Sequence, residues 1–399
     1  MDALQLSNET LKVISSLDPS WLKKQRQDAW RLFSTVDLPT TKIEEFRRTD
    51  LKGLNLSRFS TSDKETLRWE IDAEWQKRGV IASTLSEALV QNPELVEPYL
   101  GKLSRQNPWK LKLLHSALWQ GGLFLYIPKN VRFADPIRAI SLGNRDCVAQ
   151  FPHILIVLEE GAEAFVIEEL IGEGEGEQLV IPQTEIVLKS GAKLKYANLQ
   201  RLNRSSWCFS DVTTQLFRNS SLNSLVVFLG GKVTKADFTS TLLGEGANSQ
   251  MLGLAFGDGN QHFDLQTFQN HVRPETLSDL LYKTILKGKA TSIYKGLIRI
   301  EKSGQKSNAY QNNQNLLLSE RARADSQPKL EIIADDVRCT HGATVGTVDE
   351  EQLFYLRSRG LKQEEAENLI TRGFCEEVLQ RFDSGPFTEW LMTDLERKL

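Results

Sequence analysis

One short pattern recurs along the middle of the chain and limits the folds that the chain can adopt. The segments HILIVLEEGAEAFVIEEL (153–170), TEIVLKSGAKLKYANLQ (184–200) and STLLGEGANSQMLGLAFG (240–257) each contain two β-rich runs joined by a polar turn with Gly-Ala. Glycine at such a corner adopts positive φ without a Cβ clash. Short strands with Gly corners indicate a sandwich, a barrel or a β-helix. Recurrence of one corner type over much of residues 120–345 favours the β-helix.

The chain on either side of this middle zone has helical patterns instead. Residues 18–39 carry apolar residues near helical spacing before Pro39, which marks a stop. Residues 83–104 have a similar pattern after Ser83, which begins an S-x-x-x-E sequence rather than a strict capping box. The pattern therefore predicts a mixed α and β protein with three domains: residues 1–118 (helical), 119–347 (β-helix) and 348–399 (helical).

The last zone predicts three helices. Asp349 is a suitable N-cap for residues 350–360, and Gly360 is a suitable C′ residue. Further helices are expected at 362–382 and 386–399. A lobe this small buries little by itself. Its apolar face is therefore expected to pack on the β zone or on another protein.

Composition excludes several classes of function. Lys and Arg number 49 against 52 Asp and Glu, a net charge of −3, which does not favour a nucleic-acid or membrane-surface binder. No stretch reads as a secretory signal or is long and apolar enough to span a bilayer, so a cytoplasmic, soluble protein is expected. No GxxxxGK[ST] string occurs, so the chain is not expected to hydrolyse a nucleotide through a P-loop.

The stretch RCTHGATVG (338–346) holds the most chemically suggestive pair. The four cysteines are scattered without a C-x-x-C, but Cys339 and His341 stand two apart and share one face if the stretch is a strand. Thiolate and imidazole suit zinc, copper(I) and iron–sulfur chemistry, yet two ligands do not close a tetrahedral site. Cys208, His153 or a second chain can supply the rest. The alternative is a buried thiol beside a hydrogen-bonded histidine.

Two other polar stretches are open to interpretation. Alternation places His262, Asp264 and Gln266 on one strand face, which predicts a polar ladder outside a β-helix, and His271 on the opposite face. Residues 312–315, NNQN, are candidates for an amide ladder between coils. A surface site formed by Arg321, Arg323 and Asp325 would invite comparison with polysaccharide-cleaving β-helices. No paired-carboxylate arrangement supports glycosyl chemistry.

The stretch NNQNLLLSERARADSQPKLEIIADDVRCTHGATVGTVDEEQLFYLRSRGL (312–361) closely resembles the SufB/SufD family of iron–sulfur cluster assembly scaffolds. LPTTKIEEFRRTD (38–50) is similar to the leader motif of that family. Gly342, where SufB members typically have Glu, resembles the SufD branch. The resemblance implies a central right-handed parallel β-helix between helical domains. It also implies a non-catalytic subunit that pairs with SufB through the β-helix and binds the ATPase SufC through its C-terminal helices.

The resemblance also implies roles for particular residues. His341 matches a family histidine that works with a SufB cysteine at the subunit interface, and Cys339 matches a cysteine of weaker assignment. No permanent cofactor is expected, only a transient iron–sulfur cluster shared with SufB. A homodimer is a further expectation when SufB is absent. Two alternatives stay open: a purely structural adaptor, and a polysaccharide-acting enzyme. The residues expected to contact SufC are Phe354, Tyr355, Leu356, Arg357 and Arg359.

Overall fold

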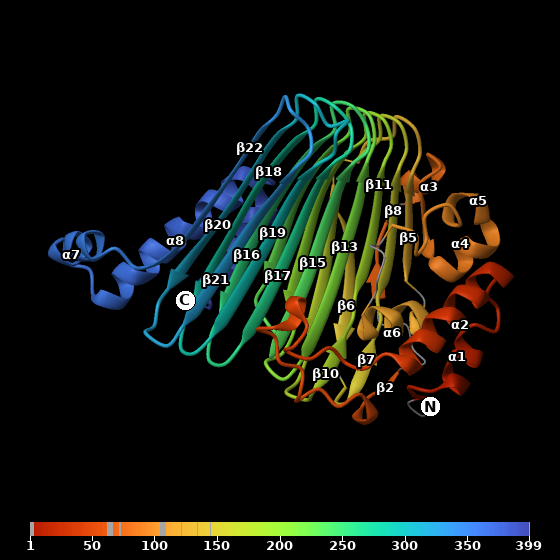
Figure 1. Cartoon of the computed structure of the whole chain (residues 1–399), viewed down its shortest axis with the longest axis horizontal. Coiled ribbons are helices and arrows are strands. Elements are labelled where there is room, and N and C mark those ends of the chain that lie inside the picture. Colours follow the sequence, from red (N-terminus) through yellow and green to blue (C-terminus); the bar gives the residue numbers. More distant parts are fainter. Residues whose placement is uncertain are drawn as a thin grey trace.

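The middle of the chain forms a parallel β-solenoid with helices at both ends (Figure 1). The computed structural model describes residues 4–61, 67–71, 73–103, 109–120, 122–133, 135–143 and 145–398. From β11 (Gln183–Leu188) to β22 (Arg338–Thr347) successive strands alternate between two sheets, and each pairs in parallel with the strand one coil away. The β-helix predicted from the Gly corners is therefore confirmed.

Within these described residues the two sheets contain thirteen and nine strands. The larger, sheet A, consists of β1 (Leu4–Gln5), β2 (Ser60–Thr61), β4 (Ile81–Thr84), β5 (Leu123–Ile127), β7 (Val148–Gln150), β8 (His153–Leu158), β10 (Gln178–Val180), β11 (Gln183–Leu188), β13 (Trp207–Leu216), β15 (Val233–Leu242), β17 (His262–His271), β19 (Thr291–Ile300) and β21 (Arg323–Ile332). Sheet B consists of β3 (Leu67–Trp69), β6 (Ile137–Gly143), β9 (Glu163–Gly172), β12 (Lys193–Arg201), β14 (Ser221–Phe228), β16 (Asn248–Gly257), β18 (Leu277–Leu286), β20 (Asn308–Leu317) and β22 (Arg338–Thr347).

The corner before each sheet B strand from β9 to β20 has a left-handed conformation. Gly161 (φ 67°) and Gly191 (φ 68°) occupy it in the first two repeats, and the Gly161 N–H donates to the Ser190 carbonyl of the next coil at 3.0 Å. Later coils keep the corner without glycine, at Glu275 (φ 58°) and Lys306 (φ 59°). A side chain there costs about 1–2 kcal/mol. The corner therefore persists in coils where the Gly-Ala pattern is lost.

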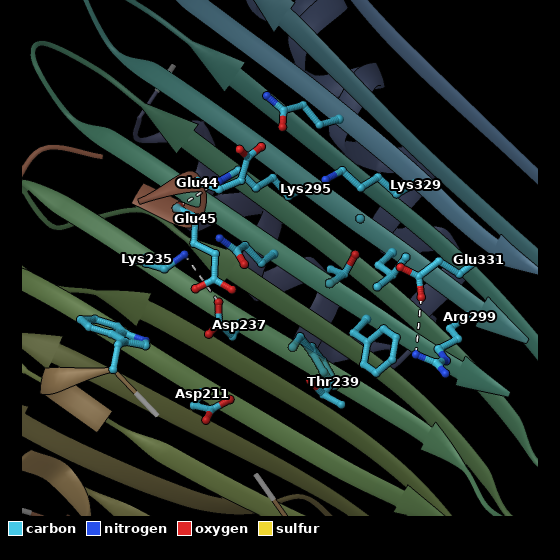
Figure 2. Close-up of a pocket in the computed structure, with 18 of the residues that line it drawn as sticks. Glu44, Glu45, Asp211, Lys235, Asp237, Thr239, Lys295, Arg299, Lys329 and Glu331 are labelled. Atoms are coloured by element: carbon cyan, nitrogen blue, oxygen red, sulfur yellow. Dashed lines mark hydrogen bonds and ion pairs between the residues drawn. The ribbon is translucent and has the colours of Figure 1, made fainter. Parts of the chain in front are cut away.

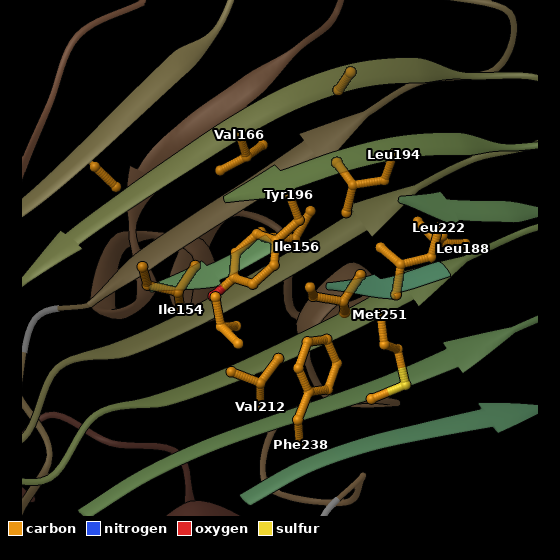
Figure 3. Packing of buried hydrophobic residues seen from close by; sticks show 14 of the residues in the cluster. Ile154, Ile156, Val166, Leu188, Leu194, Tyr196, Val212, Leu222, Phe238 and Met251 are labelled. Carbon is orange, nitrogen blue, oxygen red and sulfur yellow. The ribbon is translucent and has the colours of Figure 1, made fainter. Parts of the chain in front are cut away.

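The solenoid interior is a continuous apolar core formed by alternate residues of the strands of both sheets (Figure 3). Ile156 and Leu188 from sheet A face Val166 and Leu194 from sheet B, and all are buried. One carboxyl group interrupts this core. The buried Glu168 accepts hydrogen bonds from the hydroxyls of Tyr196 and Thr184, and burial raises its pKa, as expected for a carboxylate held away from water.

Helices of the N-terminal region pack against one end of the solenoid and the outer face of sheet A (Figure 1). Contrary to the expectation of a purely helical zone, this region also supplies β1–β4. The cap of α4 differs as well, because Thr84, not Ser83, forms a full capping box with Glu87. The helices are α1 (Asn8–Ile14), α2 (Ser20–Thr35), α3 (Ala73–Lys77), α4 (Leu85–Gln91), α5 (Pro93–Val96) and α6 (Lys110–Leu118), with 3₁₀ turns η1 (Glu44–Phe46) and η2 (Leu56–Arg58).

The segment 38–50, called the leader segment below, lies across the outer face of sheet A. Thr49 is fully buried, and its hydroxyl donates to Asp264 at 2.6 Å. Because the Thr49 hydroxyl proton is donated to Asp264, His262 donates from Nε2 to the Thr49 oxygen (3.0 Å). Its Nδ1 then accepts from the Thr291 hydroxyl (2.7 Å). The face carrying His262 and Asp264 is outside the solenoid as predicted, but Asp264 is covered rather than solvated.

The C-terminal helices are α7 (Glu350–Ser358), α8 (Gln363–Phe382) and α9 (Pro386–Glu396). Asp349 caps α7 by accepting from the N–H groups of Glu351 and Gln352, and Gly360 follows the helix at φ 98°, as predicted. Helices α8 and α9 pack on the outer face of sheet B, where their buried residues join those of the strands. The apolar face of the lobe thus packs on the β zone, whereas no residue of α7 is buried.

Candidate functional site

The candidate site lies on the last coil, at the free edge of sheet B. Strand β22 carries Cys339 and His341 and pairs only with β20 among the described strands. Cys339 is opposite Ala309, and His341 is opposite Gln311, whose side chain is fully buried. The two candidate ligands therefore share the strand face that continues the lining of the solenoid interior. The predicted same-face arrangement is confirmed.

The lining of the interior changes from apolar to polar as it reaches this edge. Along one column of paired positions the residues are Met251, Leu280, Gln311 and His341. The first two belong to the apolar core, and both amide atoms of Gln311 are buried without a hydrogen-bond partner among the described residues. A buried amide left unpaired costs about 1–3 kcal/mol. The interior of the last coils is therefore more polar than the rest, and part of it is not hydrogen-bonded.

Asn313 and Asn315 extend this polar lining. Asn315 Nδ2 donates to Asn313 Oδ1 at 2.8 Å and to the Thr344 carbonyl of β22 at 3.1 Å. Asn312 and Gln314 lie on the opposite face of β20, because strand side chains alternate. The four residues therefore do not form the single amide ladder expected from NNQN. Two of them instead support the last strand from inside.

The two candidate ligands have different environments. Cys339 is half-buried against Ile298, Ile300 and Ala334, and burial raises the pKa of its thiol to about 11. The thiol is therefore protonated at neutral pH in the isolated chain, whereas the thiolate is the metal-binding form. His341 is exposed. Its imidazole is accessible from solvent, and Cys339 needs a further positive charge or a metal to ionise.

The other candidate ligands lie elsewhere. His153 is on β8, where its Nε2 is 3.1 Å from Glu185 Oε2, and Cys208 is buried on β13 with its pKa raised to about 12. His271 is buried in hydrogen bonds to Thr276 and Ser278. Within the described residues, no group of three or more His, Cys, Asp or Glu side chains is placed to hold a metal ion. Cys339 and His341 thus remain a pair of donors without a complete coordination shell.

Helix α7 forms the second candidate region. Phe354 is 73% exposed and Tyr355 is 55% exposed, and Arg359 stacks over the Tyr355 ring at 5.3 Å. A groove of about 480 Å³ separates α7 from α8; it is lined by Glu351, Gln352, Tyr355, Leu356, Leu369 and Ile370. Large apolar side chains rarely gather in the open on a helix without a partner. Arg357 and Arg359 are also exposed, so the residues predicted to contact a partner are accessible.

Of the proposed polar surface site, only Asp325 has an observed role. It forms an ion pair with Arg48 of the leader segment, while Arg321 and Arg323 form no ion pair within the described part of the chain. A larger pocket on sheet A, lined by Lys235, Lys295 and Lys329 among others, was missed from the sequence. These lysines come from β15, β19 and β21, so only the coil register brings them together.

Comparison with known proteins identifies the family. Residues 140–374 match "SUF system FeS cluster assembly, SufBD core domain", and residues 68–139 match "SufBD protein N-terminal region". This chain belongs to the SufBD family. The iron–sulfur cluster assembly protein SufD of Bacillus subtilis (strain 168) is 30% identical over 99% of this chain and 98% of its own length. An iron–sulfur cluster assembly SufBD family protein of Staphylococcus aureus (strain MRSA252) is also 30% identical, over 79% of this chain and 68% of its own.

The SufBD core match covers both candidate regions. It contains β22 with Cys339 and His341 and the whole of α7, and it ends within α8. The family resemblance seen at 312–361 is therefore confirmed. Among the described residues, no helix is long and apolar enough to cross a membrane.

Proposed function

We propose that this SufBD protein is the SufD-type subunit of a SufBCD complex, where it helps to assemble iron–sulfur clusters at an interface with SufB. The observation that carries the proposal is the polar, open last coil with Cys339 and His341 on its inner face. A free parallel edge can be continued by a strand of another chain. Two donors with open coordination positions suit a cluster whose remaining ligands come from that chain.

In this proposal the cluster is cargo, and this chain is not its permanent carrier. His341 contributes an accessible imidazole, and Cys339 contributes a thiol that ionises only when a cation approaches. A metal ion strongly favours the thiolate form of a nearby cysteine. Iron bound first by His341 would therefore lower the pKa of Cys339, which would then bind as the second ligand. His341 is accordingly the stronger ligand candidate.

The test uses the complex reconstituted from this chain, SufB and SufC, with clusters formed anaerobically and followed by visible absorbance. We expect His341→Ala to slow cluster formation by at least about tenfold, the usual scale for losing one ligand or its support. Thr340→Ala is the matched control, since Thr340 is exposed on the outer face of the same strand. If His341→Ala assembles clusters at the unaltered rate, the chain is a structural adaptor and the cluster role is wrong.

We further propose that α7 and the groove beside α8 dock the ATPase SufC, so that ATP hydrolysis is performed by the partner. Exposure of Phe354 and Tyr355 supports this, because burying them on a partner would stabilise a complex by about 1.5–3 kcal/mol each. Phe354→Ser should abolish copurification with SufC. Leu17→Ser, which changes a residue that is 90% exposed on the N-terminal region, is the control and should leave copurification unchanged. Equal retention of SufC by both variants would rule out α7 as the docking site.

The polysaccharide-acting enzyme receives no support. The matched family assembles iron–sulfur clusters, and Asp325 is engaged with Arg48 rather than presented to a substrate.

A further inference from the structure

A pocket of about 620 Å³ lies on the outer face of sheet A, beside the leader segment (Figure 2). None of its described lining residues belongs to β22. Its volume is within the usual range for small-molecule sites. Strands β15, β17, β19 and β21 form its floor, and Glu44, Glu45 and Trp109 form part of its wall. Nothing in the proposed cluster chemistry uses this pocket.

The floor of the pocket contains an apolar surface formed by Phe268 and Leu297 on adjacent strands. Register pairs Thr239 with Phe268, Phe268 with Leu297, and Leu297 with Lys329, so these four residues form one row across the strands. Phe268 and Leu297 are both only partly buried and line the pocket. Neighbouring apolar side chains on adjacent strands make a continuous surface. An apolar or aromatic ligand body can lie on this surface, and Lys329 stands directly at its end.

Most charges on the β13–β15 side are already balanced. Lys112 Nζ lies 2.9 Å from Asp211 Oδ2 and 2.8 Å from Asp237 Oδ2. Lys235, 3% exposed, lies 3.4 Å from Asp264 and 3.8 Å from Asp237, yet its ammonium group has no hydrogen-bond partner in the described structure. This side therefore holds two lysines against three carboxyl groups, and burial raises the pKa of Asp211.

Positive charge remains on the β19–β21 side. Lys295 donates to the backbone carbonyl of Glu45 at 2.8 Å, and neither Lys295 nor Lys329 forms an ion pair with any described carboxylate. Arg299, in contrast, pairs with Glu301 and Glu331. Figure 2 shows Lys295 and Lys329 along one side of the pocket and Asp211 along the other. The two lysines are diagonal neighbours, because Gln327 pairs with Lys295 and Lys329 follows two residues later.

We propose that this pocket binds a phosphate monoester with an apolar or aromatic body. The dianionic head lies between Lys295 and Lys329, whose two charges it balances, and the body lies on Phe268 and Leu297. Charge-assisted hydrogen bonds to ammonium groups are the strong class of hydrogen bond. The wall carboxylate of Glu45, which forms no ion pair with any described residue, disfavours heads of larger negative charge.

The probes are phenyl phosphate, inorganic phosphate and benzoate, titrated into the full chain by calorimetry at low ionic strength. Phenyl phosphate should bind at least about tenfold more tightly than inorganic phosphate, which lacks the body, and than benzoate, which carries one charge. Raising the salt concentration should weaken binding, because the head is held by charge near the surface. Equal affinity for all three probes, or no binding, would overturn the proposal.

Variants separate the two halves of the site. Lys329→Gln should weaken phenyl phosphate binding by about tenfold, and Phe268→Ala should reduce its affinity to that of inorganic phosphate. Lys302→Gln, in the exposed turn after β19, removes the same charge elsewhere and should change nothing. Both pocket residues are partly or fully accessible, so the thermal midpoint of each variant should stay near that of the parent chain. Unchanged phenyl phosphate binding in Lys329→Gln would place the ligand elsewhere and sink the proposal. The outcome is independent of the cluster role, which is read out by His341→Ala.

Discussion

The two ends of the solenoid are finished in opposite ways. At the N-terminal end, β4 runs antiparallel to β5 and β3 runs antiparallel to β6, so both sheet edges are covered by strands that reverse the direction of stacking. At the C-terminal end, β21 and β22 have no further partner among the described strands. No residue of the end strand β4 is exposed, whereas eight of the ten residues of β22 are exposed.

This difference shows which end of the solenoid is covered and which end is open. Strands β3 and β4 are themselves edge strands, but they are only three and four residues long, and helices of the N-terminal region pack at this end; short or covered edges are protected from unwanted pairing. The opposite end combines an open parallel edge with exposed apolar residues, including Ile332, Ile333 and Val345, each between 45% and 48% exposed. The proposed cluster ligands are on that open end. In the proposed function, the closed end stabilises the chain and the open end associates with SufB.

The largest expected effect is a contrast in stability between the two ends. Ile156→Ala removes a fully buried side chain and should lower the free energy of unfolding by about 3 kcal/mol. Val345→Ala, on the open last coil, should lower it by less than about 0.5 kcal/mol. Urea unfolding of the isolated chain measures both. A comparable loss from Val345→Ala would mean that the last coil is covered in solution.

The leader segment lies across the outer face of sheet A between the two ends. A mutation at Thr49 tests how strongly this segment is bound to the sheet. Thr49→Ala removes the hydrogen bond to the buried carboxylate of Asp264 and should cost about 2 kcal/mol. Thr41→Ala, an exposed change in the same segment, is the control. Unfolding by urea again provides the measurement. Equal stability of the two variants would show that the leader segment is not held at this point.

The pH dependence of alkylation at Cys339 should show how far this thiol is buried at the open end. Because its pKa is raised to about 11, alkylation by iodoacetamide in the isolated chain should rise about tenfold per pH unit from pH 7.5 to 9.5. Mass spectrometry of the Cys339 peptide measures the rate. A plateau near pH 8.5 would indicate an ordinary, unburied thiol. Within the proposed complex, protection from alkylation is expected.

The smallest expected effect concerns the corners between the ends. Glu275→Gly removes the strain of a side chain at φ 58°, although glycine also loses more backbone entropy on folding. The net gain should be about 0.5 kcal/mol. The same change at Glu245, which is not among the positive-φ residues, should destabilise. If both changes destabilise equally, the left-handed corner stores no strain.

Sequence patterns predicted those parts of the fold that depend on local preference. Gly161 and Gly191 revealed the corner, and Asp349 and Gly360 marked the bounds of α7, because each residue type has a strong conformational reason for its place. The same reasoning failed at Glu275 and Lys306, where stacking against neighbouring coils imposes a conformation that the residue itself disfavours. It also failed at Ser83, where the adjacent Thr84 is the cap.

Features set by long-range register were not predictable. The alternation around Cys339 gave the shared face, but only the pairing of β22 with β20 shows that this face lines the interior. Burial of Asp264 depends on Thr49, which is more than two hundred residues earlier in the chain. The lysine pocket likewise depends on strands several coils apart. The roles of His341, Cys339 and α7 remain predictions that the mutations above test.

The parallel register has one consequence for the dynamics of this chain. Each coil is bonded only to the coils on either side, so opening can begin cheaply only where one neighbour is missing. Helices of the N-terminal region cover the closed end, whereas β22 is an exposed edge strand. Amide hydrogen exchange should therefore proceed as a gradient, fastest at β22, slower at β20 and β18, and slowest near β13. A partner strand docked on β22 would slow exchange far beyond the residues that it touches.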